Sequence, residues 1–159
     1  MSASRRKPPV PRTRRPRRAL SERAPIDWAA LETVARQARE AAYAPYSEYR
    51  VGAALLAEDG RVFAGANVEN ASYGLCQCAE RSAVGAAVTA GARRFRAICI
   101  VTGGPVPATP CGMCRQVLAE FPPVFPVRCV STGGASVDSD TQALLPGGFS
   151  PGVLEGGRG

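Results

Sequence analysis

The sequence contains no histidine among its 159 residues, and this absence narrows the chemistry open to it. Histidine is the commonest metal ligand and a frequent general base near neutral pH. Any zinc site must therefore be built from thiolates, with carboxylates as the remaining option. Clustered cysteines in a cytosolic chain bind metal or perform chemistry more often than they form disulfides. The chain has six of them: Cys76, Cys78, Cys99, Cys111, Cys114 and Cys129.

Long apolar runs are also absent. No run approaches the roughly 20 residues that a bilayer-spanning helix needs, and the N-terminus lacks the apolar segment of a secretory signal. Hydrophobic residues make up 45% of the chain, which is typical of a globular protein of one domain. We therefore expect a cytoplasmic protein that contacts no membrane.

The net charge of +7 belongs to one end of the chain. Residues 1–23 carry nine basic residues and one acid, whereas the other 136 residues carry 11 arginines and 12 acids. A folded nucleic-acid-binding domain usually has a basic face of its own, so we expect no nucleic acid to be required. We predict a disordered, basic Arg/Pro-rich tail over residues 1–24 and a folded domain over 25–155. The tail is either a solvated extension or the result of a start codon placed too far upstream, and polyanion binding is the alternative.

The apolar pattern predicts alternating helices and strands. A helix capped by Asp27 should run until Pro45 stops it, and a hairpin should join strands at 50–57 and 61–68 through Glu58-Asp59-Gly60. A helix that ends at Gly91, a strand at 95–102, a helix that ends at Pro122 and a strand at 124–131 follow. The segment after Gly133 is predicted to be rich in turns. This order predicts an α/β fold, a three-layer α/β/α sandwich with a central mixed β-sheet.

Two short segments carry the candidate chemistry, and each lies where a loop enters a predicted helix. They are Cys78-Ala79-Glu80 and Pro110-Cys111-Gly112-Met113-Cys114. A C-x-x-C pair in a first helical turn can direct both sulfurs to one point, and the helix N-terminus favours thiolates. Cys78 can supply a third. Structural zinc sites have four protein ligands, whereas catalytic ones keep a position for water.

Glu80 follows a ligand by two residues, so it can approach the metal without binding it. A carboxylate there can take the proton of an activated water and pass it on. Three thiolates and Zn²⁺ leave a charge of −1. Arg81 and the two helix N-termini are the groups available to compensate for it.

The two motifs resemble those of the zinc-dependent nucleoside deaminases, a class whose chemistry is well described. Cys78 replaces the histidine that is common there, as in the small homotetrameric cytidine deaminases. The resemblance extends over about 27–151 and includes AYAPYSEYRVGAAL, GANVENASYGLCQCAER, PCGMCRQ and LLPGGFSP. It implies one zinc per chain, hydrolytic deamination of cytidine and deoxycytidine for pyrimidine salvage, and a homotetramer with shared active sites.

The same resemblance assigns further roles by position. Asn67 and Glu69 would bind the ribose hydroxyls, and the Ala79 backbone would contact the base or the bound water. Tyr49 stands where the family usually has Phe in the pyrimidine pocket. Phe149 would cover the base in a neighbouring subunit. The family has no ligand at the position of Cys76, and Cys99 and Cys129 fall in predicted core strands.

Three other functions remain open from the sequence. A deaminase for a nucleoside antibiotic of the blasticidin S type would share the zinc motif, but Asn67-Val68-Glu69-Asn70 fits the cytidine deaminases better. A polynucleotide-editing deaminase could use the basic tail. A structural zinc module that binds nucleic acid would need a fourth ligand, such as Cys76.

Overall fold

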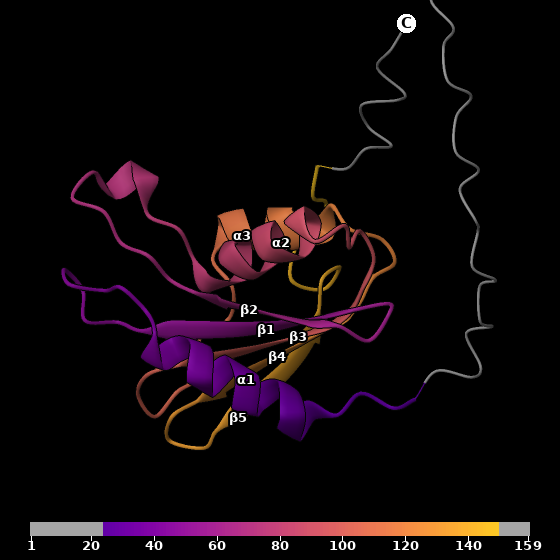
Figure 1. Ribbon diagram of the computed structural model, residues 1–159, viewed down its shortest axis with the longest axis horizontal. Helices are drawn as coiled ribbons and strands as arrows, with labels where there is room; N and C mark the ends of the chain where they lie inside the picture. The colour runs from indigo at the N-terminus through magenta and orange to yellow at the C-terminus, as the bar shows by residue number, and fades with distance from the viewer. Residues whose placement is uncertain (1–23, 150–159) are drawn as a thin grey trace, which may run out of the picture.

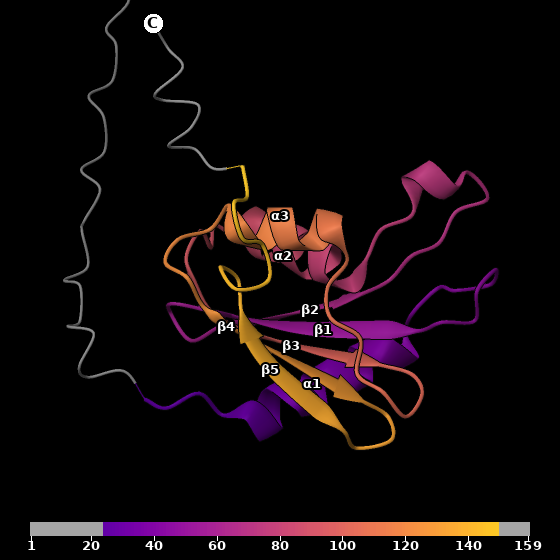
Figure 2. The ribbon, with the colours of Figure 1, turned by 180° about the vertical axis from the view of Figure 1, so that it is seen from behind.

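The structure is a computed structural model that describes residues 24–149 (Figure 1). The tail predicted for residues 1–24 lies outside the described residues except for Ala24, as do residues 150–155 of the predicted folded domain. Within the described range, a five-stranded sheet lies between one helix on one face and two helices on the other (Figures 1 and 2). The predicted three-layer α/β/α sandwich is confirmed.

The first helix, α1 (Trp28–Glu40), begins where its cap predicts. The Asp27 carboxylate accepts a hydrogen bond from the Ala30 N–H at 3.0 Å, which satisfies one of the free donors of the first turn. The helix ends at Glu40, before the predicted stop at Pro45. Tyr43 instead forms a bridge with Val68, so the segment after α1 becomes a loop beside the candidate site.

The sheet has the order β2-β1-β3-β4-β5. Strands β1 (Val51–Ala57) and β2 (Val62–Ala66) form the predicted hairpin. Strand β3 (Phe95–Thr102) pairs antiparallel with β1 and parallel with β4 (Pro126–Ser131). The predicted mixed sheet is therefore confirmed, with β3 and β4 as its parallel pair.

The prediction of turns after Gly133 was wrong for Ser136–Asp140, which form strand β5 antiparallel to β4. The segment is polar because it lies at an open edge of the sheet, where little of it is buried. Asp138 accepts two hydrogen bonds from the Arg128 guanidinium on β4, at 2.7 and 2.8 Å. This cross-strand ion pair gives the edge strand a contact that an apolar pattern cannot reveal.

Helices α2 (Ala79–Thr89) and α3 (Gly112–Ala119) cover the sheet face opposite α1 (Figure 2). The alternation of side chains along β1 and β3 divides the core accordingly. Leu55 and Ile100 belong to the cluster under α2 and α3, whereas Leu56 and Val101 belong to the cluster under α1. Helix α2 ends at Thr89 with Ala90 as its C-cap, and the φ of 85° at Gly91 suits the residue after the cap.

Cys99 and Cys129 are fully buried in β3 and β4, as predicted. Burial raises the pKa of each thiol to about 12, so both stay protonated and act as small apolar side chains. Among the helices within 24–149, we find none with the length and apolar character to cross a bilayer.

Candidate metal and catalytic site

Two helix N-termini meet at the candidate site. Cys78 is the N-cap residue of α2 and Cys111 is the N-cap residue of α3. Cys114 lies within the first turn of α3 and is fully buried. The three sulfur atoms all lie within 4.8 Å of one another. The fold thus brings Cys78 to two thiols that lie more than thirty positions later in the sequence.

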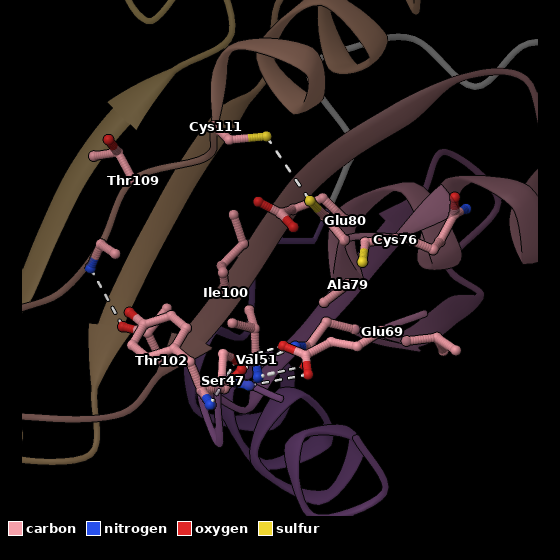
Figure 3. A pocket seen from close by; sticks show the side chains of 16 residues that line it. Ser47, Val51, Glu69, Cys76, Ala79, Glu80, Ile100, Thr102, Thr109 and Cys111 are labelled. Atoms are coloured by element: carbon pink, nitrogen blue, oxygen red, sulfur yellow. Dashed lines mark hydrogen bonds between the residues drawn. The ribbon is translucent and has the colours of Figure 1, made fainter. Parts of the chain in front are cut away.

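The cysteine cluster fits a zinc ion. Zn–S bonds of about 2.3 Å in a tetrahedron place neighbouring sulfurs about 3.8 Å apart, and the Sγ atoms of Cys78 and Cys111 are 3.8 Å apart (Figure 3). Thiolates are also ligands that zinc prefers. Three ligands leave one of the four tetrahedral positions open, as catalytic zinc sites require.

Cys76 does not join the cluster. Its sulfur accepts a hydrogen bond from the Asn70 N–H at 3.3 Å and lies 3.7 Å from the Asn70 carbonyl oxygen. Within residues 24–149, Cys78, Cys111 and Cys114 form the only group of cysteine, aspartate or glutamate side chains placed closely enough to hold a metal ion. A closed structural site with four cysteines therefore has no support in this arrangement.

Hydrogen bonds within the cluster favour one thiolate. The bond from Cys114, opposed by burial and reinforced by Arg81 and Cys111, lowers the pKa of Cys78 to about 5. The same contact with Cys78, together with burial, raises the pKa of Cys114. Arg81 lies beside the cluster: its Nη2 donates to the Cys76 carbonyl at 2.7 Å and lies 3.8 Å from the Cys78 sulfur. The site is thus prepared for negative charge before a metal arrives.

Glu80 is buried, with 5% of its surface exposed, in the first turn of α2. Burial is the main cause that raises the pKa of its carboxyl group, and the negative charge of Cys78 adds to the effect. A carboxyl group with a raised pKa exchanges protons more readily near neutral pH than an exposed one. Its position beside the cysteine cluster suits proton transfer.

A cavity of about 290 Å³ connects these groups with the loops after α1 and β2. Figure 3 shows Cys111 and Glu80 toward one end, Ile100 between, and Ser47 and Glu69 at the other end. The cavity is lined by Ser47, Tyr49, Val51, Asn67, Val68, Glu69, Cys76, Gln77, Cys78, Ala79, Glu80, Ile100, Thr102, Ala108, Thr109 and Cys111. It therefore combines apolar walls with polar groups at both ends, which is typical of small-molecule sites.

Asn67 and Glu69 bind the loop after α1 to the segment after β2. Asn67 accepts from the Val51 N–H at 2.8 Å and donates to the Tyr49 carbonyl at 2.9 Å. Glu69 accepts from the N–H groups of Tyr46 and Ser47, and from the Ser47 hydroxyl. These hydrogen bonds lower the pKa of Glu69, with that of the Ser47 hydroxyl foremost, so this carboxylate stays ionised.

Most of the residues selected from the sequence border this one cavity, including Tyr49 and Ala79. Cys114 and Arg81 are not among its lining residues, although Cys114 belongs to the cysteine cluster and Arg81 contacts it. Phe149 does not line it either. That side chain is 57% exposed, and its backbone carbonyl accepts a hydrogen bond from Gln116 at 2.7 Å. Phe149 is thus available at the surface rather than in the cavity of its own chain.

Ser47, Thr102 and Thr109 also line the cavity, and no sequence motif marked them as site residues. Thr102 ends β3, and its hydroxyl accepts the Ala108 N–H at 3.3 Å. Small hydroxyl residues in loops have no distinctive spacing. Ser47 does lie inside the segment AYAPYSEYRVGAAL that carries the resemblance, and this location was the available signal.

Comparison with known proteins identifies the class. A family model described as the cytidine and deoxycytidylate deaminase zinc-binding region matches residues 28–127. The chain belongs to this family of zinc-binding deaminases, and the three-cysteine cluster can hold one zinc ion.

Individual proteins similar to this chain are cytidine deaminases. A cytidine deaminase of Halalkalibacterium halodurans is 50% identical over 126 residues, which cover 79% of this chain and 96% of the relative. The cytidine deaminase of Sporosarcina psychrophila is 45% identical over 126 residues, with 79% and 93% covered. The crystal structure of cytidine deaminase from Burkholderia pseudomallei matches with a TM-score of 0.75 and 48% identity, and covers 78% of this chain and all of that one.

Proposed function

We propose that this protein hydrolyses cytidine and deoxycytidine to uridine and deoxyuridine and releases ammonia. The observation that carries the proposal is the placement of a buried carboxyl group, Glu80, beside three converging cysteine sulfurs, at a cavity that Glu80, Cys78 and Cys111 line. The similarity to proteins named cytidine deaminase supports this choice of substrate. Pyrimidine salvage is the metabolic role that such a reaction serves.

Cys78, Cys111 and Cys114 would hold the zinc, which when bound supplies a Lewis acid that lowers the pKa of water. Glu80 would take a proton from the attacking water and deliver it to N3 of the cytosine ring. A second transfer through Glu80 would protonate the 4-amino group, which leaves as ammonia. The overall reaction consumes one water, and C4 exchanges its amino group for oxygen. Burial of Glu80 keeps bulk water away from these transfers.

Charge supports a nucleoside rather than a nucleotide as the substrate. Among the residues of 24–149 that line the cavity, none is lysine or arginine, whereas Glu69 and Glu80 both bring carboxyl groups. Glu69 stays ionised because three hydrogen bonds lower its pKa. A 5′-phosphate would meet this negative charge without a compensating cation. The neutral sugar of cytidine offers hydroxyl donors instead.

A direct assay compares the two substrate classes. The purified protein should lower the near-ultraviolet absorbance of cytidine and of deoxycytidine and release one ammonia per nucleoside consumed. Deoxycytidylate should be a much poorer substrate. Glu80→Gln protein, with its zinc content measured, is the matched control and should lose at least about 10²-fold in turnover. Faster turnover of deoxycytidylate than of deoxycytidine would refute the assignment.

The sugar and base contacts follow the same proposal. Asn67 and Glu69 would bind the ribose hydroxyls, and Tyr49 and the Ala79 backbone would contact the base. Arg81 would offset the charge of the thiolates. Asn67 lines the cavity. Glu69 borders it at the end away from Cys111, which supports the orientation of the nucleoside (Figure 3).

We also propose a homotetramer in which Phe149 of one subunit covers the base in a neighbour's cavity. The exposure of Phe149 outside its own cavity supports this role. Residues 25–155 would form the catalytic domain, and the basic segment 1–24 would not be needed for turnover. A reducing compartment such as the cytoplasm would keep the cysteine ligands reduced.

A further inference from the structure

Ser47 holds the carboxylate at the far end of the cavity. All three hydrogen bonds that Glu69 accepts within the described residues come from Tyr46 and Ser47. The two backbone N–H groups donate to Oε2 at 2.8 and 3.2 Å. The Ser47 hydroxyl donates to Oε1. One side chain therefore determines how the second oxygen of Glu69 is oriented.

The direction of the Ser47 hydroxyl is itself fixed. Its oxygen accepts the Tyr49 N–H at 3.0 Å, so one of its lone pairs is occupied. Its single proton is given to Glu69. The Tyr49 carbonyl in turn accepts from Asn67 at 2.9 Å. Ser47 thus connects Glu69 with Tyr49 and, through it, with Asn67.

A count of acceptor positions shows what remains for a ligand. An ionised carboxylate has about four acceptor positions, two on each oxygen. The backbone donors occupy both positions of Oε2, and Ser47 occupies one position of Oε1. One acceptor position is left, on Oε1, and Glu69 borders the cavity. This geometry suits a single hydroxyl donor.

We propose that Ser47 is a positioning residue that sets the preference of this site for a hydroxylated sugar. The inference rests on the proposed function, and it deepens the role of Glu69. By holding Oε1, the Ser47 hydroxyl leaves one acceptor aimed at one sugar hydroxyl. Without it, Oε1 has two unsatisfied positions, the carboxylate can rotate about the backbone contacts of Oε2, and the hydroxyl of the sugar loses its oriented partner.

The test uses two ligands that differ in their sugar hydroxyls. KM and kcat are measured for cytidine, and 2′,3′-dideoxycytidine is measured as a competitive inhibitor. In Ser47→Ala, the KM for cytidine should rise roughly tenfold, as expected when a hydrogen bond to a charged group is lost, and kcat should change less than twofold. The inhibition constant of the dideoxy analogue should stay within twofold, because it lacks the 2′- and 3′-hydroxyl groups from which Glu69 would accept a hydrogen bond.

Three further proteins sharpen the result. Ser47→Thr keeps the hydroxyl and should restore the KM for cytidine. Ser136→Ala, on the exposed edge strand, is the matched control and should leave both constants unchanged. In a Glu69→Gln background, Ser47→Ala should have little additional effect on the KM, because the two residues act as one unit.

Two outcomes would overturn the role of Ser47. One is an equal weakening of cytidine and its dideoxy analogue in Ser47→Ala, which would indicate a general distortion of the loop. The other is an unchanged KM for cytidine. Failure of the wild-type protein to deaminate cytidine at all would instead refute the proposed function, so the two failures are distinguishable.

Discussion

Replacement of Gly65 by alanine should damage the site through the packing of α2. Gly65 lies on β2 beneath the first turns of α2, the helix that begins at Cys78 and carries Glu80. A Cβ atom at this position would lie 2.9 Å from the Cα of Ala83 and still closer to the backbone of Ala79 and Ala83. Ordinary contacts begin near 3.4 Å. The backbone of α2 must therefore move by more than about half an ångström, because the closer contacts have further to open.

Two effects of Gly65→Ala can be estimated: the loss in free energy of unfolding from overpacking, and the loss in activity from displacement of α2. Overpacking of this kind costs about 1–3 kcal/mol in the free energy of unfolding, because the obstacle is rigid backbone rather than a flexible side chain. A displacement of this size at the start of α2, where Cys78 and Glu80 lie, should also lower kcat/KM at least about tenfold. Urea unfolding, zinc content and cytidine turnover of the refolded, zinc-loaded protein measure the two effects separately.

Gly52 provides the matched control. A Cβ atom there would lie 2.9 Å from the Cα of Arg39 in α1, on the opposite face of the sheet. Gly52→Ala should lose a similar free energy of unfolding but keep more of its zinc and activity per folded molecule, since α1 carries no proposed ligand. Equal losses of turnover in both variants, at equal stability, would refute the argument that Gly65 acts through the position of α2.

Two other predictions concern the metal and the assembly. Cys78→Ala should remove zinc and activity together, whereas Cys76→Ala should retain about one zinc per chain; metal analysis of both proteins decides this, and equal zinc loss would contradict the ligand assignment. Phe149→Ala should raise the KM for cytidine and leave zinc unchanged, because the side chain lies outside the cavity of its own chain. Light scattering during size exclusion should give the mass of a tetramer, and a fully active monomer would exclude a shared site.

The elements that sequence predicted well are those with strong local signals. Asp27 caps α1, Asp59-Gly60 lies in the turn of the hairpin, and the apolar runs form buried strands, all as predicted. Strand β5 was missed because Ser136–Asp140 has no apolar alternation, and its pairing depends on contacts such as Arg128 with Asp138. A pattern of apolar residues indicates which side chains are buried, and an edge strand buries few of its side chains.

The candidate site likewise contains residues that local sequence patterns predict and residues that they do not. The spacing of Cys78, Cys111 and Cys114 in the sequence predicted a cluster because each group lies near a helix start, where local geometry restricts the sulfur positions. Ser47 was not predicted. Its hydrogen bond to Glu69 spans 22 positions and depends on how two loops pack together, which no local pattern encodes.

The lack of histidine has a consequence for the whole site, since each of the three ligands would bring a negative charge. Three thiolates exceed the charge of Zn²⁺ by one, and burial already disfavours ionisation of Glu80. Arg81 contributes one positive charge 3.8 Å from the Cys78 sulfur, and each helix N-terminus contributes about half a charge. The carboxyl group and the cysteine cluster could therefore lie side by side because Arg81 and the starts of α2 and α3 would compensate for the thiolates. The same two helix starts would also supply the ligands, so the arrangement that gathers the sulfurs would be the one that stabilises their charge.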